Sequence, residues 1–152
     1  MLAVIRIRGS IGIRKGVEDT LIMLRLKDVN QCVLLAEKRD IKGMVEKCRD
    51  YITYGEVDKE TIMALLKKRL RQMGNKRVDE KILKEITGFE SFENFADAII
   101  EGKNKLKDFE KLQQNFRLTP PSKGFNSIKE HYPKGDLGDR GKEISELLKR
   151  MI

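Results

Sequence analysis

Residues 1–57 alternate between two hydrophobic patterns, and this alternation constrains the fold more than any other feature of the chain. Apolar residues recur at every second position over residues 2–8, which predicts a β-strand, and at helical spacing from Val17 onward. Residues 31–36 form a short apolar run typical of a covered strand, a second helical stripe follows, and residues 51–57 favour a third strand. The order strand, helix, strand, helix, strand predicts an α+β fold in which helices pack on one face of a small sheet.

The two faces of the first predicted strand differ in character. One face carries only apolar side chains, whereas the other begins apolar and ends with Arg6 and Arg8. Because the helices would cover one face of the sheet, we expect the face with these two arginines to stay open for a ligand or a partner.

Residues 58–152 predict a mostly helical extension of this core. Apolar spacing favours a helix whose stripe runs from near Asp58 to Met73, then two shorter helices, and a last amphipathic helix over residues 142–152. Residues 115–142 contain all 3 prolines and several glycines, so they read as a loop without regular structure. Loops of this length are usually functional or disordered, and we expect one that is ordered or becomes ordered on its partner.

The charge of the chain points to an anionic partner. Its 152 residues carry a formal net charge of +8, which favours binding to an anion such as nucleic acid. The basic run of Lys67, Lys68, Arg69 and Arg71 has two open interpretations, a solvated helix face or a contact with that partner.

Several other classes of protein are disfavoured. No apolar run reaches the roughly 18 residues of a membrane span, and the first residues are too quickly charged for a signal peptide, so we expect a soluble cytoplasmic protein without a membrane partner. Cys32 and Cys48 lie in apolar periodic segments, which favours buried thiols over a disulfide. His131 is the single histidine, which argues against a zinc site.

The pair Gly141-Lys142 resembles part of a nucleotide-binding P-loop, but the rest of that motif is missing. Asp136 stands where the first glycine is needed, and Glu143 stands where a serine or threonine would hold magnesium. We therefore expect no enzyme, no catalytic residue, no metal and no cofactor.

Several motifs, in order along the chain, resemble those of large-subunit ribosomal protein thirty. They are the turn Ser10-Ile11-Gly12, the stretch "LRLKDVNQ" over residues 24–31 and the helix "KGMVEK" over residues 42–47. In its second half, "FRLTPPSKGF" and "KGDLGDRGKEISELLKRMI" resemble the archaeal version, whose eukaryotic counterpart is large-subunit ribosomal protein seven. Bacterial members are similar only to the first part, and eukaryotic members carry a long basic N-terminal arm, so we expect an archaeal source.

The resemblance implies a fold and a function. It implies an antiparallel three-stranded sheet with two helices, similar to a ferredoxin fold, with residues 1–57 as the family's core domain and residues 58–152 as the archaeal and eukaryotic type of C-terminal extension. It further implies a structural constituent of the large ribosomal subunit that binds rRNA, near the 5S rRNA, and contacts neighbouring ribosomal proteins. An RNA-binding or regulatory module outside the ribosome stays open as an alternative.

Glycine-rich basic loops are the candidate RNA-binding segments. In "GSIGIRKG", residues 9–16, glycines would let the backbone approach RNA and cations would bind phosphates, although the same glycines could merely form the turn from strand to helix. Phe125 and Tyr132 could stack on a base or fill the protein core. The candidate RNA-binding residues are Arg6, Arg8, Ser10, Gly12, Arg14, Lys15, Arg25, Lys27, Arg117, Lys123, Gly124, Lys134, Arg140 and Lys142.

Overall fold

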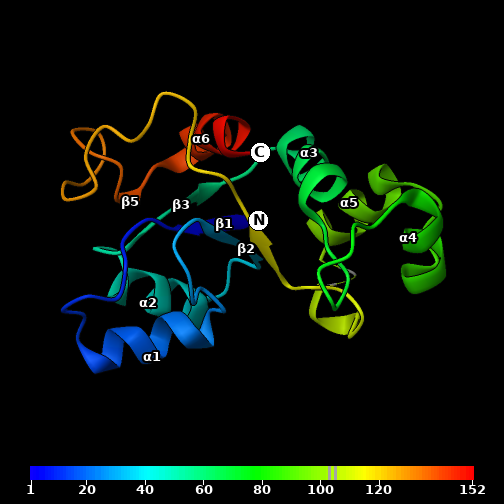
Figure 1. The fold of residues 1–152 in the computed structure, drawn as a ribbon, viewed down its shortest axis with the longest axis horizontal. Helices are drawn as coiled ribbons and strands as arrows, with labels where there is room; N and C mark the ends of the chain where they lie inside the picture. The colour runs from blue at the N-terminus through cyan, green and yellow to red at the C-terminus, as the bar shows by residue number, and fades with distance from the viewer. Residues whose placement is uncertain (103, 105) are drawn as a thin grey trace.

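The structure is a computed structural model that describes residues 1–102, 104 and 106–152. Its strands and helices follow one another as labelled in Figure 1. The strands are β1 (Leu2–Arg6), β2 (Gln31–Leu35), β3 (Ile52–Glu56), β4 (Asn115–Arg117) and β5 (Gly138–Asp139). The α-helices are α1 (Lys15–Met23), α2 (Arg39–Lys47), α3 (Lys59–Arg69), α4 (Glu80–Thr87), α5 (Phe92–Ile100) and α6 (Ile144–Met151), and short 3-10 helices are η1 (Leu106–Asp108) and η2 (Gly141–Glu143).

The described strands form one mixed sheet in the order β4–β2–β1–β3–β5. β2 and β3 both pair antiparallel with β1, which confirms the predicted α+β fold with its three antiparallel strands. β4 adds to β2 in antiparallel orientation, and β5 adds to β3 in parallel orientation. Both outer strands come from residues 115–142, where the sequence favours an irregular loop. They have only 3 and 2 residues, which is too short for an alternating pattern to appear.

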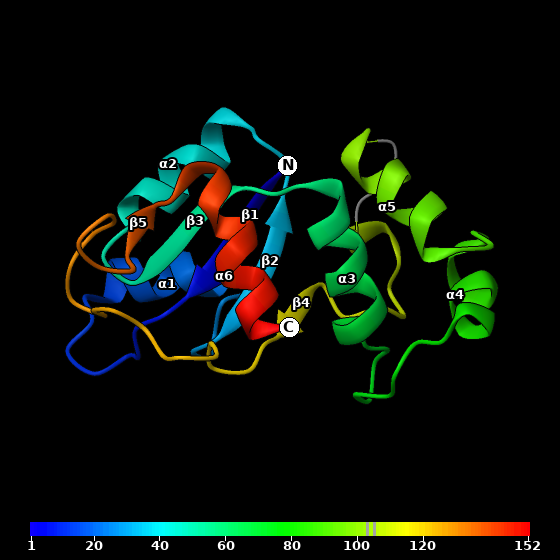
Figure 2. The same cartoon turned by 90° about the horizontal axis from the view of Figure 1, so that it is seen from above.

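Helices cover both faces of the sheet (Figure 1, Figure 2). On one face, Val4 joins Leu21 of α1 and Val45 of α2 in a buried cluster. On the other face, Ile5 packs in a second cluster that includes Leu148 of α6. The expectation that the face with Arg6 stays open is therefore wrong, because α1 and α2 cover that face. The last helix of the chain, α6, covers the opposite face, so neither face is open.

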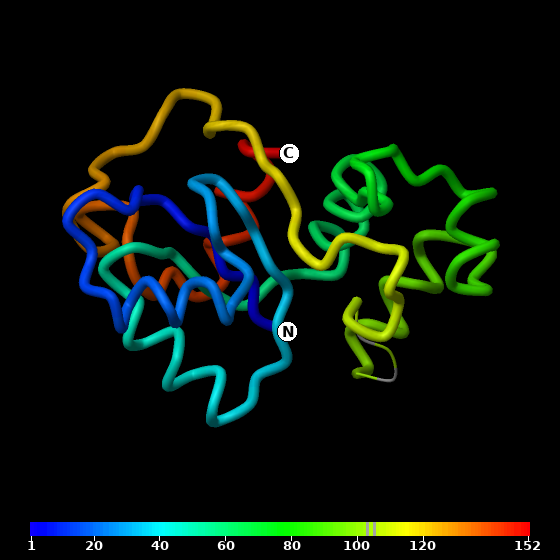
Figure 3. The backbone as a smooth tube through the Cα atoms, turned by 60° about the horizontal axis from the view of Figure 1, so that its bottom comes forward, coloured from blue at the N-terminus to red at the C-terminus, as the bar shows by residue number. Residues whose placement is uncertain are grey.

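A helical lobe of α3, α4, α5 and η1 lies beside the sheet (Figure 3). Its centre is Phe95, which is fully buried, with its ring 5.5 Å from that of Phe89 and 5.6 Å from that of Phe109. The chain passes between the two lobes where β3 leads into α3 and where the chain leads into β4 (Figure 3). Met73, predicted on the apolar stripe of the α3 helix, is 64% exposed because that helix ends at Arg69.

The close contact between β3 and the turn before α6 depends on Gly55. A Cβ at residue 55 would collide with the carbonyl oxygen of Gly141 and lie 3.0 Å from the Cβ of Ile144. We expect Gly55→Ala to lower the free energy of unfolding by about 2–3 kcal/mol, since the crowded groups include backbone that cannot rotate away. Denaturant titration measures this loss.

Gly43 provides the matched control for this substitution. It lies inside α2, and a Cβ there would meet nothing within 4 Å. Because glycine is unfavourable within a helix, Gly43→Ala should raise stability by about 0.5–1 kcal/mol. Equal effects of the two alanines would refute the role assigned to Gly55.

Candidate nucleic-acid interface

One end of the sheet brings together segments that are far apart in the chain. Because β1 runs antiparallel to β2 and β3, its carboxyl end lies beside the start of both neighbours. The amide of Asn30 donates to the carbonyl of Arg6 at 2.8 Å, and the amide of Leu118 donates to the carbonyl of Asn30 at 2.9 Å. We call residues 7–15, 24–30 and 117–124 at this end the basic edge.

The basic edge holds most of the predicted site residues. The exposed cations on it are Arg14, Lys15, Arg25, Lys27, Arg117 and Lys123. Within the part of the chain that the structure describes, none of these six side chains makes a hydrogen bond or an ion pair. Arg8 is half-buried, lies 5.0 Å above the ring of Tyr51 and donates to the carbonyl of Asp50 at 3.2 Å. The edge thus carries six cations that face solvent.

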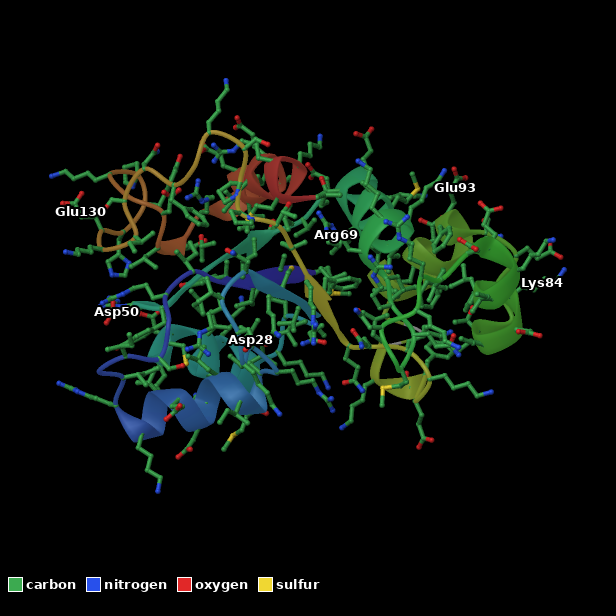
Figure 4. All side chains as sticks on the ribbon, in the orientation of Figure 1. Asp28, Asp50, Arg69, Lys84, Glu93 and Glu130 are labelled. Carbon is green, nitrogen blue, oxygen red and sulfur yellow. The ribbon has the colours of Figure 1, made fainter. Side chains whose placement is uncertain are left out.

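Two acids near the basic edge, Asp28 and Asp50, are already engaged within the protein; Figure 4 labels both. The carboxylate of Asp28 accepts a hydrogen bond from the side-chain amide nitrogen, Nε2, of Gln31 at 2.7 Å. The carboxylate of Asp50 lies 2.9 Å from Nε2 of His131. Because these two carboxylates have partners of their own, the cations of the basic edge stay available to an anion from outside the protein.

The loop after β1 has an open, glycine-dependent turn. The amide of Ile13 donates to the carbonyl of Ser10 at 3.3 Å, and Gly12 has a φ of +70°, which favours glycine. A Cβ added at Gly12 would meet nothing within 4 Å, so the backbone faces open space. Ile11, at the tip, is 101% exposed. This exposure is a feature that the sequence pattern does not reveal, because the same Ser10-Ile11-Gly12 turn also suits a buried isoleucine.

Arg6 lies beneath the basic edge and is only 2% exposed. Its guanidinium donates to the carbonyls of Arg8 at 2.9 Å, Leu26 at 2.8 Å and Lys27 at 2.6 Å. A further bond, at 2.8 Å, goes to Oγ of Ser10. Burial lowers the pKa of Arg6 below its ordinary value, although the charge of Asp28 acts in the opposite direction. Arg6 was a candidate RNA ligand, but its charge is used to join two segments of the edge.

Arg140 is also turned inward, at 9% exposure. It donates to the carboxylate of Asp136, which is 1% exposed, and its guanidinium lies 5.0 Å from the ring centre of Tyr132. The hydroxyl of Tyr132 donates to Glu143. Of the two aromatic candidates for base stacking, Tyr132 is therefore held by the protein's own groups, and Phe125 packs against the core. Arg140, a predicted RNA ligand, serves this internal network.

Two further predicted residues lie away from the centre of the basic edge. Lys142 is exposed beside the opposite end of β1, where it lines a hollow with Leu2 and Lys42. Lys134 is exposed in the segment that follows residues 117–124, where the neighbouring His131 contacts Asp50. The structure therefore brings together the residues of 7–15, 24–30 and 117–124, and separates Lys142 from them.

The cysteines and acids of the described residues do not form a metal site. Cys32 and Cys48 are buried free thiols, as predicted. No group of three His, Cys, Asp or Glu side chains suited to a metal ion occurs among residues 1–102, 104 and 106–152. Every helix in the described part of the chain falls short of the length and apolar character needed to cross a bilayer.

Comparison with known proteins identifies the family. The family model described as "Ribosomal protein L30p/L7e" matches residues 2–52. A protein from Archaeoglobus fulgidus named "Large ribosomal subunit protein uL30" is 44% identical over 151 residues, which cover 99% of each chain. A protein of the same name from Thermoplasma volcanium is 45% identical, and the match covers 100% of this chain and 93% of that protein. Another, from Methanococcus maripaludis, is 44% identical, and the match covers 99% of this chain and 98% of that protein. Together with the fold, these matches show that the chain belongs to the ribosomal protein L30p/L7e family, in its archaeal form.

Proposed function

We propose that this chain is a structural constituent of the large ribosomal subunit and that its basic edge binds the phosphate backbone of large-subunit rRNA. Membership of the family and the names of the archaeal relatives support the ribosomal role. The observation that carries RNA binding is the set of exposed cations on three loops at one end of the sheet, whose side chains have no partner among the residues that the structure describes. The position near the 5S rRNA follows from the family resemblance alone.

The loop after β1 can engage RNA through three kinds of group. Arg14 and Lys15 supply charge for phosphate oxygens, which dominate the affinity of such complexes. Oγ of Ser10 accepts its bond from Arg6, so the hydroxyl proton stays available to a phosphate oxygen. Gly12 adds no side chain that would hold RNA away from the backbone. Lys27, Arg117 and Lys123 extend this surface along the edge.

Sedimentation tests the ribosomal role itself. In extract of the source organism, the chain should stay with the large subunit through a high-salt wash. A chain that remains near the top of the gradient would instead favour the free RNA-binding or regulatory module.

The double substitution Arg14→Gln with Lys15→Gln tests the basic edge. We expect it to weaken binding to protein-free large-subunit rRNA at least roughly a hundredfold, because each of the two lost charge-assisted hydrogen bonds contributes about 1.5–3 kcal/mol. The slope of log affinity against log salt concentration should fall by about 2, one unit for each lost phosphate contact. Filter binding over a salt series measures both quantities.

A matched pair of substitutions controls for net charge. Lys38→Gln with Lys81→Gln removes the same charge from exposed positions at the start of α2 and on α4. Its salt slope should stay close to that of the unmodified protein. Equal losses in the two pairs would mean that net charge, and not the basic edge, sets the affinity.

A further inference from the structure

A basic hollow of about 360 Å³ lies at the carboxyl end of α3. We call it the α3 hollow. Its basic lining consists of Lys67, Lys68, Arg69, Arg71 and Arg77, and the acidic side chain in the lining is Asp79. The excess of positive charge is therefore concentrated in a concave site on the helical lobe.

Most of these cations have no protein partner. Lys67, Lys68, Arg71 and Arg77 form no ion pair within the described ranges of the chain. The dipole of α3 accounts for cations in its last turn, which includes Lys67 and Lys68. It does not account for Arg71 and Arg77, which lie beyond the helix. A different reason is needed for the charges on that segment.

The backbone holds Arg71 and Arg77 opposite each other. The two residues form an antiparallel bridge, closed by a turn in which the amide of Asn75 donates to the carbonyl of Gln72 at 2.9 Å. Like charges directly opposite each other on paired strands are destabilising. A bound anion between or beside the two guanidinium groups would remove this repulsion, and arginine forks suit phosphate oxygens.

The α3 hollow is connected to the basic edge. Arg69, which lies between the two lobes (Figure 4), donates to Oγ1 of Thr119 at 3.2 Å and to the carbonyl of Ile152 at 2.9 Å. In Figure 2, the loop after β1, the segment around residues 118–124 and the turn at residues 71–77 all lie along the lower edge of the view. A single polyanion on that side of the molecule could reach all three.

We propose that the α3 hollow is a second phosphate-binding site, which holds the backbone of the rRNA that the basic edge binds or of a neighbouring rRNA segment. The inference rests on the proposed function and extends it to the helical lobe. The matching chemistry is a phosphodiester chain, because phosphates recur along it and several cations can be neutralised at once. An acidic protein segment is the competing occupant.

Directed cleavage of RNA tests the proposal with single introduced cysteines. Met73→Cys places a tether for an iron chelate on the turn beside the α3 hollow, and Ile11→Cys places one at the tip of the loop after β1. The native thiols do not compete, since both are buried and burial raises the pKa of Cys32 to about 12. Hydroxyl radicals from each tether then cut protein-free large-subunit rRNA wherever the strand lies close.

We expect cuts from both positions. In a background of Arg71→Gln with Arg77→Gln, cuts from residue 73 should weaken at least fivefold, while cuts from residue 11 persist. Cuts from residue 11 with none from residue 73 would overturn the second site and leave the proposed function standing. Absence of cuts from both would overturn the proposed function. If the assembled subunit gave cuts from residue 73 only in ribosomal proteins and not in rRNA, an acidic protein segment would replace RNA as the occupant.

Discussion

Arg6→Ala should lower the free energy of unfolding by about 3–4 kcal/mol. The buried guanidinium donates to three carbonyls and one hydroxyl. Its removal therefore leaves the carbonyls of Leu26 and Lys27 without a hydrogen-bond donor. A loss of this size is a large share of the roughly 5–15 kcal/mol that holds a domain folded. Arg6→Lys should not restore the loss, because an ammonium group cannot reproduce the planar fork of donors. Equilibrium denaturation measures both variants.

Arg8→Ala is the control for this prediction. Arg8 lies two residues further on and is half-buried, with one bond to a carbonyl and a contact with the ring of Tyr51. We expect it to cost no more than about 1 kcal/mol. Should Arg6→Ala match Arg8→Ala in stability but bind rRNA far more weakly, Arg6 would be a direct phosphate ligand and not an internal link.

Asp136→Ala should be the other strongly destabilising substitution, with a loss of about 3–5 kcal/mol. Its carboxylate accepts from the amides of Asn126 and Ser127 and from the buried guanidinium of Arg140. Alanine would leave a buried positive charge without its partner and two amides without an acceptor. Denaturant titration gives the loss, and faster hydrogen exchange at Asn126 and Ser127 locates it.

Two companion variants make this prediction specific. Asp139→Ala removes an exposed carboxylate whose one hydrogen bond within the described ranges comes from the amide of Gly141 at 2.9 Å, and it should cost about 1 kcal/mol or less. Asp136→Ala with Arg140→Met removes both charges, so it should recover much of the loss. If the double variant is as unstable as Asp136→Ala alone, the amides of Asn126 and Ser127 are the dominant partners.

The order of elements could be predicted from the sequence because each element of the first part is long enough to show its period. The strands β1, β2 and β3 each have 5 residues. In the second part, α5 is one of the two shorter helices that the apolar spacing predicts, and its apolar stripe is buried. The hydrophobic pattern did not predict β4 and β5. Gly138 and Asp139 belong to residue types that strands disfavour, and only the neighbouring β3 makes them a strand.

The role of Arg6 could have been read from the alternation itself. Leu2, Val4 and Arg6 lie on the same face of β1, and two apolar residues on that face indicate that helices cover it. An arginine in the same row is then expected to be buried and bonded. Arg140 offered no such signal, because its burial depends on Asp136 and Tyr132, which a tight fold of residues 126–140 brings together. The division of the chain after residue 57 stays a prediction.

The closure of the sheet by the last helix has a consequence for biosynthesis. While the chain is being translated, β1, β2 and β3 emerge first. At that stage Ala3 and Ile5 are exposed to solvent on the side that α6 later covers. That side is covered only after α6 has left the exit tunnel. Packing α6 against β1 requires a large loop to close, which slows folding. In the meantime an aggregation-prone apolar surface stays exposed. A nascent chain of this kind would gain from a chaperone, or from docking on its polyanionic partner as soon as synthesis ends.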